Sequence, residues 1–246
     1  MLTSIPTQVL WLGGLILQAA ILFGLWHRRL YRDLPIFFSY TAFLIVRSLV
    51  LYVVHGASAW GYFYGYWIGE VLSWAWGLAV IQEVMQRLFQ SYAAVQRLVV
   101  VLFRWAAVLL IVVAAFAAYA APGSNSERLI ASFLVLERSV RIIQVGLLSL
   151  LFVFAGFLRL RWPHYIFGIA LGFGVFCSAE LAAITVRTHD MWTHSVFTLL
   201  KPLAFVVAQG IWIFYIAVPE RSPAVAAEPA PQMEGWNVAL MELLRR

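Results

Sequence analysis

Ionisable side chains occur inside long apolar stretches of this sequence, where acids and bases together could hold a charged ligand. Seven of them are predicted to lie in the outer half of the membrane: Arg47, Glu70, Glu137, Arg138, Arg141, Glu180 and Lys201. A charge near the centre of a bilayer costs roughly 2.5–3.5 kcal/mol, so such residues usually face the interior of a helix bundle and pair there. The bases exceed the acids by one, which favours an anionic small molecule or lipid that enters from outside. A purely structural network, from which Arg47 and Lys201 extend towards water, is the alternative.

The composition excludes a water-soluble domain. Hydrophobic residues make up 63% of the 246 residues and charged residues only 11%, against roughly 45–50% and about 25% in soluble domains. The single cysteine, Cys177, excludes an intrachain disulfide and a metal site built from several cysteines. The net charge of +6 comes mostly from the connections between apolar stretches, so it does not call for a nucleic-acid partner. No basic segment precedes the first apolar stretch, which indicates a retained span and not a cleaved signal peptide.

Seven apolar stretches are each long enough for a membrane-spanning helix, which needs about 20 residues. They cover residues 8–26, 35–54, 61–84, 98–120, 129–158, 164–186 and 194–218. The sequence therefore predicts an all-α membrane protein, a bundle of seven transmembrane helices in the plasma (inner) membrane. Arginines gather in the first, third and fifth connections and in the tail, while the other side carries only Arg128 and Arg187. Because basic residues favour the cytoplasmic side, we expect the N-terminus outside and the C-terminus inside.

Three regions are predicted along the chain. Residues 1–218 form the transmembrane domain, residues 219–232 a disordered linker rich in Pro and Ala, and residues 233–246 an amphipathic C-terminal helix. That helix could lie on the inner leaflet or bind a cytoplasmic partner. The stretches "GLWHRRLYRDLPIFF" and "GFLRLRWPHYIF" are alike. Their likeness is either coincidence of composition or a sign of two three-helix units around a single fourth helix, as in some transporters.

The charged residues are predicted to lie at one level. At a rise of about 1.5 Å per residue, ionisable groups on five of the helices lie about 9–12 Å below the outer helix ends. The helical period adds polar and aromatic residues to the same faces. The candidate ligand-binding residues are Arg47, Tyr66, Glu70, Trp74, Glu137, Arg138, Arg141, Glu180, Thr198 and Lys201. We expect them to line a pocket in the outer half of the bundle.

Lys201 lies in the seventh predicted helix and Glu70 in the third. In these two positions the chain resembles the rhodopsins, in which a lysine of the seventh helix binds retinal as a Schiff base. The resemblance implies retinal on Lys201 with Glu70 as its counterion. The sequence departs from both rhodopsin patterns, because Phe197 stands where the microbial pattern has an acid and the Asn-Pro-x-x-Tyr stretch of the animal pattern is absent. No other cofactor is expected.

Possible metal ligands occur in the outer connections. They are His55, His189, Asp190 and His194. Imidazole and carboxylate groups bind zinc, but a spacing of five between the last two histidines does not put them on one helical face, and solvated side chains are the alternative. Glu83–Arg87 and Glu137–Arg141 have the i, i+4 spacing of ordinary helical ion pairs.

These patterns favour a receptor-like or sensory binding protein that relays binding to its cytoplasmic tail through helix shifts. A small-solute transporter is the alternative, because Pro202 beside Lys201 could break the last helix. A structural subunit of a membrane complex and a retinal pigment are further alternatives. An enzyme is not favoured, since the sequence lacks the motifs of a nucleophile elbow, a phosphate loop or a dinucleotide-binding turn.

Overall fold

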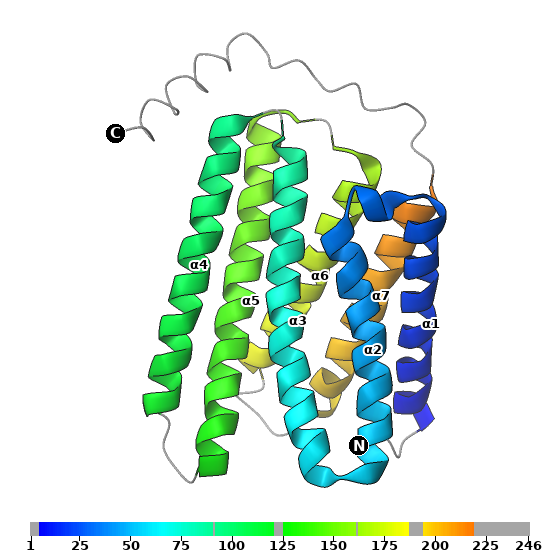
Figure 1. The fold of residues 1–246 in the computed structure, drawn as a ribbon, viewed down its shortest axis with the longest axis vertical. Helices are drawn as coiled ribbons and strands as arrows, with labels where there is room; N and C mark the ends of the chain where they lie inside the picture. Colours follow the sequence, from blue (N-terminus) through cyan, green and yellow to red (C-terminus); the bar gives the residue numbers. More distant parts are fainter. Residues whose placement is uncertain (1–4, 91, 121–124, 161, 187–193, 219–246) are drawn as a thin grey trace.

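The computed structural model describes residues 5–90, 92–120, 125–160, 162–186 and 194–218, and all regular structure within them is helical. The elements are α1 (Ile5–His27), the short 3-10 helix η1 (Leu30–Arg32), α2 (Pro35–Ala57), α3 (Ala59–Leu88), α4 (Ala93–Ala120), α5 (Asn125–Phe157), α6 (His164–Val186) and α7 (His194–Ala217) (Figure 1). The seven α-helices match the seven predicted stretches to within a few residues at each end. The linker predicted over 219–232 and the helix predicted over 233–246 lie outside the described residues.

Six of the seven helices form a closed ring, and the remaining helix, α4, lies outside it. Along the ring, α1 contacts α2, α2 contacts α3, α3 contacts α5, α5 contacts α6, α6 contacts α7, and α7 returns to α1. Helix α3 also contacts α6 across the ring. Among the described elements α4 contacts only α3 and α5, and it stands at one side of the bundle (Figure 1). The ring therefore encloses a common interior to which α4 does not contribute.

Five helices contain segments that are long and apolar enough to cross a membrane. The segments are Pro35–Gly56, Val95–Phe116, Ser132–Phe157, His164–Ile184 and Leu200–Ala217. The described apolar part of α1, Leu12–His27, is shorter, and α3 carries charged residues such as Glu70 and Glu83 that lower its hydropathy. Large apolar side chains such as Trp105, Ile111 and Phe116 are exposed along α4. An apolar surface of this kind needs lipid around it, and the chain is thus an α-helical, multi-pass membrane protein.

The tightest helix contact joins α6 and α7 through glycines. A Cβ atom on Gly172 would overlap the Trp212 ring, and one on Gly168 would overlap Tyr215. The Trp212 indole donates a hydrogen bond of 3.2 Å to the backbone carbonyl of Ile169. Small residues let two helices approach closely where lipid offers no hydrophobic drive for association. This contact fixes the position of α7 against α6.

Polar contacts tie together the end of the bundle formed by residues 28–34, 88–90, 158–160 and 162–163, which we call the arginine end. The Glu83 carboxylate accepts the backbone N–H groups of Ile36 and Phe37 at 2.8 and 2.9 Å, and so caps the first turn of α2, whose N–H groups have no partner within the helix. Arg87 lies 3.9 Å from Asp33. The predicted Glu83–Arg87 pair is therefore wrong, because the start of α2 lies closer to the carboxylate and needs an acceptor.

We predict that Gly172→Ala destabilises the protein by about 1–3 kcal/mol, because the added methyl group has no room beside Trp212. Gly174 is a matched control two residues further along α6, since the nearest atom to an added Cβ there lies 3.9 Å away. Gly174→Ala is expected to be neutral or stabilising by up to about 1 kcal/mol, through helix propensity. Thermal unfolding in detergent micelles measures both, and equal effects of the two changes would contradict the packing described.

Candidate functional site

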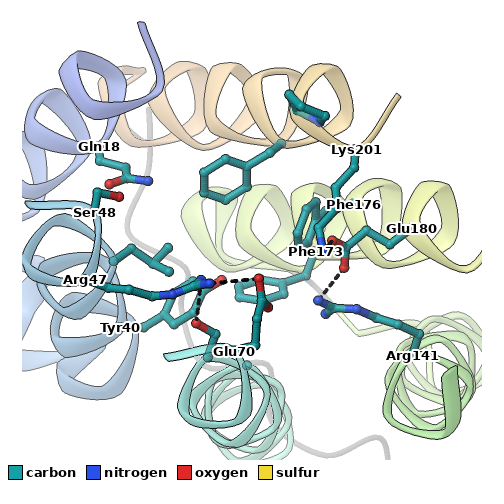
Figure 2. Close-up of a pocket in the computed structure, with 15 residues that line it drawn as sticks. Gln18, Tyr40, Arg47, Ser48, Glu70, Arg141, Phe173, Phe176, Glu180 and Lys201 are labelled. Atoms are coloured by element: carbon teal, nitrogen blue, oxygen red, sulfur yellow. Dashed lines mark hydrogen bonds and ion pairs between the residues drawn. The ribbon is translucent and has the colours of Figure 1, made fainter. Parts of the chain in front are cut away.

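A cavity of ≈ 330 Å³ lies inside the ring of helices and has walls from α1, α2, α3, α5, α6 and α7 (Figure 2). Its charged lining residues are Arg47, Glu70, Arg141, Glu180 and Lys201. Its aromatic lining residues are Tyr40, Phe173, Phe176 and Phe205. The cavity thus combines ionic groups with apolar ring faces, which is the usual composition of a small-molecule site.

The first charged wall joins α2 to α3. The Arg47 guanidinium lies 2.8 Å from the Glu70 carboxylate and donates a hydrogen bond of 3.2 Å to the Ser73 hydroxyl. Its centre lies 5.8 Å from the centre of the Tyr66 ring, within the range of a cation–π contact. Gly69 lets the arginine pass close to the α3 backbone, because a Cβ atom there would lie 2.6 Å from Arg47 Nε.

The second charged wall joins α5, α6 and α7 around Glu180. We call Glu137, Arg141, Glu180 and Lys201 the Glu180 cluster. Glu180 forms ion pairs with Arg141 and with Lys201, the latter at 3.0 Å, and Lys201 also lies 3.2 Å from Glu137. Arg141 donates a further hydrogen bond of 2.7 Å to the Gln144 side chain. Because Glu180 and Arg141 are almost fully buried, each needs the other to compensate its charge.

Arg138 does not belong to this network. Its side chain is exposed on α5, and the ion pairs of the described residues do not include it. Without it, Arg47, Arg141 and Lys201 balance Glu70, Glu137 and Glu180, and the network is neutral. The surplus positive charge expected from the sequence is therefore wrong. So is the predicted i, i+4 pair, because Glu137 binds Lys201 and Arg141 binds Glu180, across helices.

The remaining predicted residues have different surroundings. Tyr66 packs on Arg47 behind the cavity wall, and Trp74 is buried without lining the cavity. Glu137 supports Lys201 from outside the lining. Thr198 lies in α7, but its side chain lies outside the described part of the chain. The role of these residues in ligand binding stays a prediction.

Several lining residues were not among the sequence candidates. They are Gln18, Tyr40, Leu44, Ser48, Ser73, Gly77, Phe173, Phe176, Pro202 and Phe205. Gln18 could have been predicted to face the interior, because it is the only strongly polar side chain in the middle of α1. The phenylalanines that line the cavity could not have been predicted, since a ring that lines a cavity has the same sequence pattern as a ring in an apolar core. No family model, curated protein or solved structure matches this chain.

The cofactor and metal candidates can be placed only in part. In the described structure Lys201 pairs with Glu137 and Glu180, and Glu70 pairs with Arg47 and not with Lys201. His55 contacts Tyr62, with ring centres 5.0 Å apart. His189, Asp190 and the side chain of His194 lie outside the described residues. The residues that are described contain no group of three or more His, Cys, Asp or Glu side chains suited to a metal ion.

We predict that Arg141→Met destabilises the protein by about 3–5 kcal/mol, because it leaves the buried Glu180 carboxylate without its guanidinium partner. Arg138→Met, three residues earlier on the same helix, is the matched control and is expected to change stability by less than about 0.5 kcal/mol. Denaturant or thermal unfolding of the purified variants gives both values. A loss in Arg138→Met as large as that in Arg141→Met would contradict the assignment of the two arginines.

Proposed function

We propose that the chain is a seven-span protein of the plasma (inner) membrane, with its N-terminus outside, and that its cavity binds a small ligand from the outside. The protein is receptor-like: ligand binding is relayed through helix shifts to the cytoplasmic side. The observation that carries this proposal is the cavity with its two charged walls and aromatic lining. Its volume of ≈ 330 Å³ lies within the range of roughly 300–1,000 Å³ found for ligand pockets.

The distribution of arginines supports the proposed orientation. Arg28, Arg29, Arg32 and Arg159 lie in connections at the arginine end, whereas at the opposite end the described residues offer Ser58 between α2 and α3 and one arginine, Arg128, near the start of α5 (Figure 1). Short connections with an excess of basic residues stay in the cytoplasm. The cavity residues Lys201 and Glu70 lie nearer to the opposite end, and the ligand would reach them from outside.

The seventh helix supports a relay. Lys201 and Pro202 line the cavity, and Pro202 leaves one backbone carbonyl of α7 without its helical hydrogen bond, which makes this turn easier to bend. At the arginine end the Arg28 guanidinium donates hydrogen bonds of 2.7 and 3.1 Å to the carbonyls of Ala217 and Val218. One helix therefore connects the cavity to the first cytoplasmic connection.

A small-solute transporter is the second candidate. The cavity lies between the group α1–α3, which supplies Gln18, Arg47 and Glu70, and the group α5–α7, which supplies Arg141 and Lys201. Helix α4 lies outside both groups. Sites between two three-helix units suit transport by alternating access, in which one unit moves against the other.

We predict that a cysteine at position 48 reacts with a charged, membrane-impermeant thiosulfonate applied from outside, because Ser48 lines the cavity. The background is Cys177→Ala, which removes the one native cysteine. Val46→Cys is the matched control: this position on the same helix is 58% exposed on the ring's outer surface, where lipid would exclude the reagent. Labelling is measured in sealed vesicles of known orientation.

The same labelling separates the two candidates. Reaction of Ser48→Cys from the outside alone fits a receptor, while reaction from either side of the membrane fits a transporter with alternating access. Protection of Ser48→Cys from both sides, or labelling equal to that of Val46→Cys, would refute an aqueous cavity and the binding function with it.

A further inference from the structure

Polar groups in the cavity wall have hydrogen-bonding capacity left over. Gln18 and Arg141 are each 5% exposed, and both line the cavity. Gln18 Oε1 and Arg141 Nε have no hydrogen-bond partner among the described residues. Arg47 Nε has none either, but it lies against the α3 backbone at Gly69. The Lys201 ammonium has three N–H donors; one donates to Glu137, and the ammonium also forms an ion pair with Glu180 at 3.0 Å. The two buried groups, Gln18 Oε1 and Arg141 Nε, are costly unless a partner satisfies them.

The unused groups lie on opposite sides of the cavity. Arg141 and Lys201 extend into it from α5 and α7, while Gln18 extends into it from α1 on the other side (Figure 2). Arg141 and Lys201 are donors and require an acceptor such as a carboxylate. Gln18 Oε1 is an acceptor and requires a donor such as an ammonium. Glu70 extends from α3 and lies between Arg47 and Arg141 (Figure 2); its contact with Arg47 uses Oε1, and a carboxylate can accept further hydrogen bonds at its other oxygen.

The charge balance selects among ligands. The three bases and three acids of the network sum to zero. A ligand with a net charge would therefore add an uncompensated ion to a buried, neutral site, which is unfavourable. A ligand that carries both charges adds none. The aromatic rings of Tyr40, Phe173 and Phe205 also line the cavity and can contact a ligand cation through their faces.

We propose that the cavity binds a small zwitterion that carries one ammonium and one carboxylate group. The carboxylate accepts hydrogen bonds from Lys201 and from Arg141 Nε, and the ammonium donates to Gln18 Oε1 against the aromatic lining. The cavity volume of ≈ 330 Å³ restricts the ligand to a small molecule. This proposal rests on the proposed ligand-binding function and replaces the anionic ligand expected from the sequence.

The test uses probes that share one carbon chain and differ in charge. They are the zwitterions 2-aminopentanoate and 5-aminopentanoate, the anion pentanoate and the cation pentylamine. Titration calorimetry on the full chain in nanodiscs gives their dissociation constants. At least one zwitterion is expected to bind about ten-fold or more tightly than pentanoate and pentylamine. Equal or tighter binding of either singly charged probe, or no binding of either zwitterion, would overturn the proposal.

A variant that removes one recognition group gives a second measurement. Gln18→Leu replaces the carboxamide by an apolar side chain of similar size and is expected to weaken binding of the zwitterion about ten-fold. Arg138→Met, which lies outside the network, should leave the dissociation constant unchanged. Unchanged affinity in Gln18→Leu would remove the assignment of the ammonium position and overturn the binding mode.

Thiol labelling distinguishes failure of this proposal from failure of the proposed function. If pentanoate protects Ser48→Cys from the reagent and the zwitterions do not, the cavity is a ligand site and the zwitterion proposal is wrong. If Ser48→Cys does not react at all, the cavity is not accessible from water, and both proposals are wrong.

Discussion

Opposite charges held between helices determine how this bundle is assembled. A carboxylate or guanidinium removed from water carries a cost that only a close partner offsets, so each such helix must turn its charged face towards another. The Arg47–Glu70 pair joins α2 to α3, and the Glu180 cluster joins α5, α6 and α7. Helices α1 and α4 contribute to neither group: α4 lies outside the ring, while α1 joins it through contacts with α2 and α7 that include the hydrogen bond from Gln209 to the Gly14 carbonyl. The ion pairs therefore fix how the helices that carry them are rotated and which of their faces meet.

The paired charges explain why a cavity remains inside the ring. The side chains of Arg47 and Arg141 reach their carboxylate partners along the walls and leave the space between the two walls to aromatic rings and to the cavity. The glycine contact between α6 and α7 holds Lys201 beside Glu180, and Arg28 holds the other end of α7. Rigid packing at both positions leaves the turn at Pro202, next to the cavity, as the point where α7 can most easily bend.

Much of the helical layout could be predicted from the sequence, and the site only in part. The length of each apolar run predicts each helix, and a constant rise per residue brings Lys201 and Glu180 to one level. Arg138 and Arg141 have nearly the same depth and similar faces, so only the rotation of α5, which depends on its packing against α6, decides that Arg141 is buried. Glu83 shows the same limit, because its partners at the start of α2 are distant in sequence.

The charge balance of the buried network can be tested through the ion pair of Lys201 and Glu137. Lys201→Met should lower the melting temperature because it leaves two carboxylates with too few cations, and adding Glu137→Gln should recover most of that loss by restoring neutrality. Glu83→Gln changes a carboxylate outside the network, so combining it with Lys201→Met should lower the melting temperature further. An unchanged melting temperature in Lys201→Met, or strictly additive losses in Lys201→Met with Glu137→Gln, would contradict a balanced network.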